Sequence, residues 1–75
     1  DLEGALADYN RAIGAKPDFM EAIQNRSLLH MVLKDYPSAL KDLDRMLELK
    51  PDDQVTIQNR KVIQALVDSL GGKAS

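Results

Sequence analysis

The sequence predicts an all-α fold made of antiparallel helical hairpins, and three observations support this prediction. Ala, Leu and long polar residues dominate the 75 residues, while aromatic residues make up only 4%, too few for an ordinary all-β core. The prolines at 17, 37 and 51 and the few glycines leave four segments long enough for helices. Within these segments, apolar residues recur at the i, i+3, i+4, i+7 spacing of amphipathic helices.

The first two helices are predicted over residues 1–15 and about 19–34. Apolar residues at positions 2, 5, 6, 9, 12 and 13 form one stripe along the first helix. Asp18 and Glu21 have the spacing of a capping box, because both carboxylates can accept hydrogen bonds from amides of a helical first turn. We therefore expect these two acids to start the second helix.

The third and fourth helices have clearer start and stop signals. Asp35 supplies an acidic cap and Pro37 an early-turn proline, after which an apolar stripe runs to Leu47 and Pro51 stops the helix. Asp52 or Asp53 is expected to cap a last helix over about 54–70. Gly71 and Gly72 are expected to end it before a short tail.

The chain also repeats itself at a constant interval along the sequence. Positions 34 apart are identical at 12 of the 41 places where the chain overlaps its shifted copy, against about two or three expected by chance. Pro17 returns as Pro51, and the run Ile-Gln-Asn-Arg at 23–26 returns unchanged at 57–60. A fixed period of this length is typical of helical repeat proteins.

This period and its motifs resemble the tetratricopeptide repeat family, whose unit is an A helix followed by an antiparallel B helix. Ala5-x3-Tyr9 followed by Pro17 matches the B-helix signature, and Ala39-x3-Leu43 followed by Pro51 matches it with Leu in the aromatic place. The A-helix signature is degenerate here, since Arg26-Ser27 stands where Leu-Gly is usual.

The resemblance implies a right-handed solenoid fragment with helix order B-A-B-A. Its parts are a half repeat at 1–19, a full repeat at 20–53, a C-terminal capping helix at 54–70 and a tail at 71–75. Polar residues at 60, 61, 64 and 68 favour the capping role for the last helix, so we expect any missing repeats to precede Asp1. The apolar stripe of the first helix would then lack its usual cover.

Composition argues against several functions. With no cysteine and one histidine, the chain has no thiolate nucleophile and no ordinary zinc site, and we expect no cofactor. A net charge of −2 gives no footprint for nucleic acid, and no apolar run is long enough for a membrane span. No catalytic motif is present, so we expect a soluble, non-enzymatic protein, with a cytoplasmic location favoured.

In the resembling family, the A helices line a concave face that binds peptides. The residues expected on this face combine amides near the helix N-terminus with apolar side chains further on: Glu21, Gln24, Asn25, Leu28, Met31, Val32, Gln58, Asn59, Val62 and Leu66, with Val55 and Ala65 in equivalent places. Amide side chains can hold a peptide backbone. The sequence therefore predicts a protein or peptide partner on this face.

Alternatives remain at this point. The apolar residues of the face can instead pack against an identical copy, which would make the chain a self-association element and a homodimer or larger oligomer. A subgroup of the family binds the C-terminal carboxylates of chaperone tails with Lys and Asn side chains. This sequence has only the Asn of that set, as Asn25 and Asn59, and uncharged residues where the subgroup has basic ones. Arg26 and Arg60 are expected to pack their stems between helices and pair with an acid such as Asp8 or Asp42.

Overall fold

The computed structural model describes residues 1–71 and is helical throughout apart from short turns. The helices are α1 (Leu2–Ala15), α2 (Met20–Val32), α3 (Tyr36–Leu49) and α4 (Gln54–Gly71). The all-α prediction is confirmed, and all four helices lie where the sequence placed them, to within one or two residues at most ends. The part of the predicted tail from residue 72 onward lies outside the described residues.

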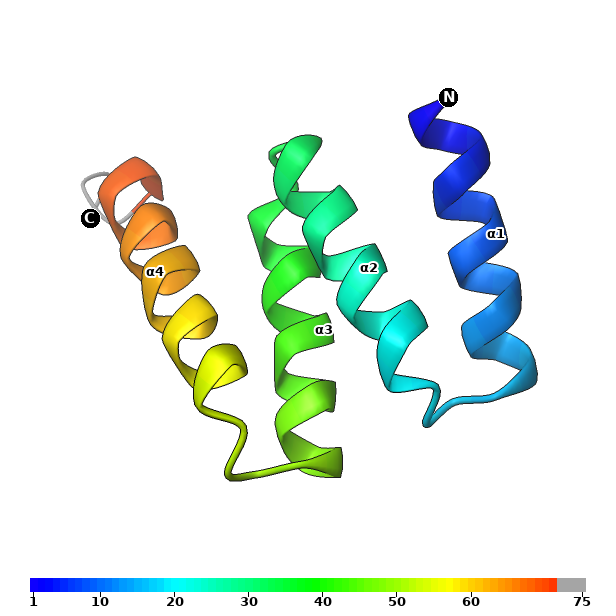
Figure 1. Cartoon of the computed structure of the whole chain (residues 1–75). Helices are drawn as coiled ribbons and strands as arrows, with labels where there is room; N and C mark the ends of the chain where they lie inside the picture. Colours follow the sequence, from blue (N-terminus) through cyan, green and yellow to red (C-terminus); the bar gives the residue numbers. More distant parts are fainter. Residues whose placement is uncertain (72–75) are drawn as a thin grey trace.

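Successive helices run in opposite directions and pack in chain order (Figure 1). Helix α2 contacts α1 on one side and α3 on the other, while α3 contacts α2 and α4. In the described part of the chain α2 and α4 do not contact each other, because α3 lies between them. The result is a flat molecule of 39 × 31 × 17 Å.

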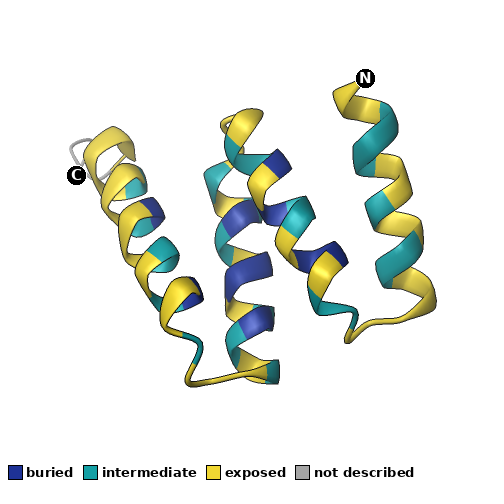
Figure 2. Cartoon of the chain, in the orientation of Figure 1, coloured by how far each residue is buried: buried dark blue, intermediate teal, exposed yellow. Residues whose placement is uncertain are grey.

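The hydrophobic core lies around α3. The buried side chains of its central cluster come from α2, α3 and α4: Ile23, Ala39, Leu43, Met46 and Ile63. Helix α1 contributes no buried residue, and among its side chains only Ile13 packs against this cluster (Figure 2). Burial of an Ile, Leu or Met side chain stabilises a fold by about 1.5–3 kcal/mol, so the stabilising contacts are concentrated in α2, α3 and α4.

Two of the predicted helix caps are confirmed. Asp35 accepts a hydrogen bond from the Ser38 amide (3.4 Å), and a proline follows in the first turn of α3. Asp53 accepts from the Val55 amide (3.2 Å) and from Thr56 Oγ1 (2.9 Å) at the start of α4. Hydrogen bonds from Ser38 and Thr56 hold the pKa of Asp35 and Asp53, respectively, below the ordinary aspartate value.

The predicted capping box of α2 is wrong. The N-cap of α2 is Phe19, and no side chain caps this helix. The Phe19 amide donates to the Lys16 carbonyl (3.0 Å), and the Phe19 carbonyl accepts from the Ile23 amide (3.0 Å). Asp18 therefore lies in the preceding turn, one residue too early to cap, and Glu21 belongs to the first turn without a cap residue to complete the box.

Helix α2 also ends earlier than predicted, at Val32 instead of residue 34. Lys34 adopts a left-handed conformation with φ of 62°. Its amide donates to the Met31 carbonyl (3.0 Å), and the Asp35 amide donates to the His30 carbonyl (2.8 Å). This is the Schellman pattern, in which a left-handed residue ends a helix by reversing the chain onto its last carbonyls.

The repeat period is present in the backbone as well as in the sequence. Lys16 and Lys50, which are one period apart, end α1 and α3, and their backbone amides donate hydrogen bonds to the carbonyls of Ala12 (2.9 Å) and Met46 (2.8 Å). Both have the same extended conformation, with φ of −141° and −144°. Equivalent residues therefore make equivalent turns before α2 and α4.

Candidate functional site

Exposed apolar side chains occupy repeat-related positions on α2 and α4. Leu28 and Val32 of α2 are 46% and 64% exposed, and their counterparts one period later, Val62 and Leu66, are 48% and 38% exposed. The next residues along from Leu28 and Val62, which are Leu29 and Ile63, are buried at 8% and 0%. Helices α2 and α4 are therefore apolar on two sides, of which only one packs inside the molecule.

Amide side chains precede these apolar residues on both helices. Gln24 and Gln58 are exposed, and Asn25 and Asn59 are half-buried. Glu21 is exposed one turn before Gln24, while its counterpart on α4 is Val55, which is 62% exposed. Most predicted site residues thus reach the surface, and on both helices the amides at 24, 25, 58 and 59 precede the apolar residues at 28, 32, 62 and 66. We call the surface formed by the residues at positions 24, 25, 28 and 32 and at 58, 59, 62 and 66 the A-face.

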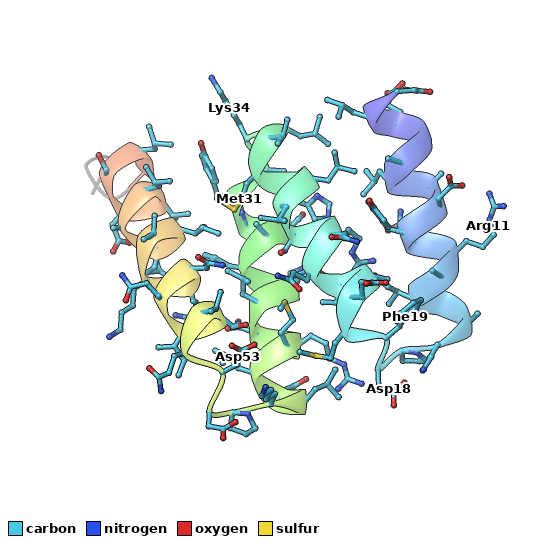
Figure 3. All side chains as sticks on the ribbon, viewed as in Figure 1. Arg11, Asp18, Phe19, Met31, Lys34 and Asp53 are labelled. Carbon is cyan, nitrogen blue, oxygen red and sulfur yellow. The ribbon has the colours of Figure 1, made fainter. Side chains whose placement is uncertain are left out.

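Met31 differs from the other predicted site residues. Its side chain is half-buried and packs against the core cluster around α3 (Figure 3). Val67 of α4 packs against the same cluster. Met31 is therefore a packing residue of the core as well as a predicted site residue.

Leu70 extends the apolar part of the A-face on α4 and was not predicted. It is 70% exposed and lies one helical turn after Leu66, which itself lies one turn after Val62. The signal was present in the sequence as an i, i+4, i+8 series of Val62, Leu66 and Leu70. The series was missed because the repeat pairs Leu70 with Tyr36, which lies on α3 and not on α2.

The A-face is open. Residues 1–71 enclose no pocket, and the two halves of the face stand on helices that α3 separates. No charged residue belongs to it, and Glu21 is the nearest acid in the α2 sequence. Such a surface can offer hydrophobic contact and amide hydrogen bonds to an extended or helical segment, and it has no enclosed volume in which to surround a small molecule.

A second polar cluster joins α1, α2 and α3 around Arg26. The guanidinium donates from Nε and a terminal nitrogen to the two carboxylate oxygens of Asp42 (2.9 and 2.5 Å), and its other terminal nitrogen donates to Asn10 Oδ1 (3.0 Å). The predicted pairing of Arg26 with an acid is therefore confirmed. The hydrogen bond with Asp42 raises the pKa of Arg26, so the guanidinium keeps its charge.

His30 lies beside the same pair. Its Nε2 is 3.7 Å from Asp42 Oδ2, and its Nδ1 is 3.9 Å from Asp35 Oδ2. Nδ1 is buried without a hydrogen-bond partner among the described residues. The side chain packs between α2 and α3, and it belongs to no group of three or more metal-binding side chains in residues 1–71.

Arg60 occupies the place of Arg26 on α4 and repeats one of its contacts. Its Nε donates to Asp44 Oδ1 at 2.6 Å. Asp44 is the counterpart of Asn10, so the contact of α1 with α2 and that of α3 with α4 each carry an arginine hydrogen bond between equivalent positions, from a terminal nitrogen in Arg26 and from Nε in Arg60. The expected pairing of Arg60 with an acid is therefore confirmed, and the acid is Asp44, not Asp8 or Asp42.

Comparisons with known proteins gave no match: no family model fits the sequence, and neither curated proteins nor solved structures showed significant similarity to the chain. In the part of the chain that the structure describes, no helix has both the length and the apolar character needed to cross a bilayer.

Proposed function

We propose that this chain is a non-enzymatic interaction module of the tetratricopeptide repeat type, which binds an apolar or amphipathic segment of a partner protein on the A-face. The observation that carries the proposal is the repeated exposure of Leu28 with Val62 and of Val32 with Leu66. An apolar residue exposed once needs no explanation, but two pairs exposed at equivalent positions of two helices indicate a surface with a common use.

The free energy gained by burying these apolar side chains predicts that a peptide binds with moderate affinity. Complete burial of a Leu or Val side chain is worth about 1.5–3 kcal/mol, and these four are about half-buried already, so covering each gains about 1 kcal/mol. Association and ordering of the peptide oppose binding by several kcal/mol. The amides of Gln24, Asn25, Gln58 and Asn59 must therefore add hydrogen bonds to the peptide backbone.

The charge of the A-face favours an uncharged segment. Its eight residues are all neutral, so a strongly acidic tail finds no cation there and a basic one finds no carboxylate on the face itself. Burying an unpaired charge against such a surface costs free energy without compensation. A segment with apolar side chains at i, i+3, i+4 or at alternate positions suits the spacing of both helices.

Selection from a displayed library of random dodecapeptides tests this proposal. We expect the chain to enrich apolar or amphipathic sequences, and Leu28→Asp and Val62→Asp to abolish binding of the enriched peptides while helicity by circular dichroism is retained. Leu2→Asp is the matched control, because Leu2 is also 46% exposed but lies on α1. Enrichment of no sequence, or binding that survives both A-face substitutions, would refute the proposal.

A further inference from the structure

A second exposed surface lies on α1, and the equivalent surface of α3 is buried within the molecule. Helix α1 is the repeat counterpart of α3, and three α3 residues buried at its contact with α2 and in the core are Ala39, Asp42 and Leu43. Their counterparts on α1 are Ala5, Asp8 and Tyr9, none of which is buried. The contrast is largest for the acids, because the Asp42 side chain is 5% exposed and that of Asp8 is 76% exposed. Within residues 1–71, α1 contacts only α2.

The matching surface lies at the other end of the same chain. Helix α4 is the counterpart of α2, and its Ile57 and Arg60 repeat Ile23 and Arg26. Arg26 bonds both Asn10 and Asp42, whereas Arg60 bonds Asp44, the counterpart of Asn10. The one contact of Arg26 that Arg60 does not repeat is the contact with Asp42.

We infer that a second copy of this chain docks head to tail, with α4 of one molecule packed on α1 of the next. In this arrangement Arg60 meets Asp8 of the neighbouring copy and reproduces the pair that Arg26 makes with Asp42. The order of helices across the junction then continues the order within the chain, since α4 is followed by the neighbour's α1 as α2 is followed by α3.

Two features of the structure support this occupant over others. First, the packing of α1 on α2 is repeated by the packing of α3 on α4. The arginine hydrogen bonds to Asn10 and Asp44 occupy equivalent positions, and so do the turns after Lys16 and Lys50. The charges also match, since Arg60 of α4 is the counterpart of Arg26 and Asp8 of α1, whose side chain is 76% exposed, is the counterpart of Asp42. The interface joins different surfaces, so it extends to open chains of copies.

One residue weakens the contact relative to its internal template. Ser27 of α2 is 2% exposed, and its counterpart on α4 is Lys61, a longer side chain that must bend aside for a helix to approach. The association between copies is therefore weaker than the packing of α2 on α3. Lys61→Ser removes this obstacle and is expected to strengthen association by about tenfold or less, the effect of one packing contact.

Sedimentation velocity over micromolar to millimolar concentrations tests the inference with charge-swapped variants. The unmodified chain is expected to associate as its concentration rises. Asp8→Arg alone and Arg60→Asp alone each place like charges at the junction, and each is expected to weaken association by about tenfold or more. An equimolar mixture of the two variants is expected to associate again, because every junction between unlike copies pairs an arginine with an aspartate, whichever variant supplies α4.

Controls separate this interface from the A-face and from unfolding. Asp52→Arg changes an exposed acid in the turn before α4 and should leave association unchanged, as should Leu28→Asp on the A-face. Circular dichroism must show that each variant keeps its helices. A chain that stays monomeric at the highest concentration, or association that both single variants retain, overturns the inference. So does a mixture of the two variants that associates no better than either alone, and none of these results bears on peptide binding.

Discussion

Arg26 of α2 and Asp42 of α3 form a two-point hydrogen-bonded ion pair across the contact of their helices, with Nε 2.9 Å and a terminal nitrogen 2.5 Å from the carboxylate oxygens. The same guanidinium reaches Asn10 on α1. One side chain therefore links three helices. Its head pairs with a carboxylate whose side chain is only 5% exposed.

The first prediction compares Arg26→Ala with Arg60→Ala. Loss of Arg26 leaves the buried Asp42 without its ion-pair partner, which should lower the free energy of unfolding by about 2–4 kcal/mol. Loss of Arg60 breaks an exposed pair with Asp44 and should cost about 0–1 kcal/mol. Urea denaturation measures both, and equal losses would show that the Arg26 pair has no special role.

A second prediction concerns the left-handed residue after α2. Lys34 has φ of 62°, a conformation that glycine adopts without steric cost. Lys34→Gly should therefore stabilise the fold by a few tenths to about 1 kcal/mol, the gain being reduced by the larger entropy of glycine in the unfolded chain. Lys41→Gly, in the middle of α3, is the control and should destabilise by about 1 kcal/mol. A loss of stability in both variants would contradict the proposed strain at Lys34.

The third prediction is a loss of stability in acid. The pKa of Asp35 and that of Asp53 are lowered in the folded chain, chiefly by hydrogen bonds from Ser38 and Thr56. A lowered folded pKa gives stability that is present above the unfolded value of 3.8 and is lost as the pH falls through the folded value. The urea midpoint should therefore fall between pH 5 and pH 2.5.

Asparagine substitutions check the cause of this acid effect. Asp35→Asn with Asp53→Asn keeps an oxygen that can cap each helix but removes both titrating groups. The double variant should show a shallower fall in the urea midpoint over the same pH range. An identical fall would assign the acid sensitivity to other carboxylates.

A fourth prediction separates the two apolar sides of α4. Ile63 is 0% exposed and belongs to the core cluster, so Ile63→Ala should lower the free energy of unfolding by about 2–5 kcal/mol. The adjacent Val62 is exposed, and Val62→Ala should change it by about 0.5 kcal/mol or less while weakening peptide binding. Equal destabilisation by the two substitutions would mean that Val62 packs inside the fold.

The period of the sequence predicted the helices well because it reports packing that occurs twice. Helix order, the turns at Pro17 and Pro51 and the pairing of Arg26 with Asp42 all follow from apolar spacing and simple charge complementarity. Local backbone choices were harder to predict. Asp18 has a side chain suited to an N-cap, but the turn after α1 includes Asp18, so that Phe19 occupies the N-cap position of α2.

The period held information that local motif reading overlooked. Phe19 and Asp53 are one period apart and both precede a helix, so the cap at Asp53 could have placed the start of α2 correctly. Lys34 gave no such signal, because lysine rarely adopts a left-handed conformation and its counterpart, Asp68, lies within α4. For the candidate site, residue positions were predictable, but the partial burial of Met31 depends on tertiary packing against the core cluster.

The most direct test of the account is an amide chemical-shift map of the chain on titration with a dodecapeptide enriched by the library selection. We expect the largest shifts at the A-face, in residues 24–32 of α2 and 58–66 of α4, and little change in α1. Leu28→Asp should remove these shifts. Shifts confined to α1 or α3, or shifts that Leu28→Asp leaves intact, would contradict the assignment of the A-face as the partner-binding surface.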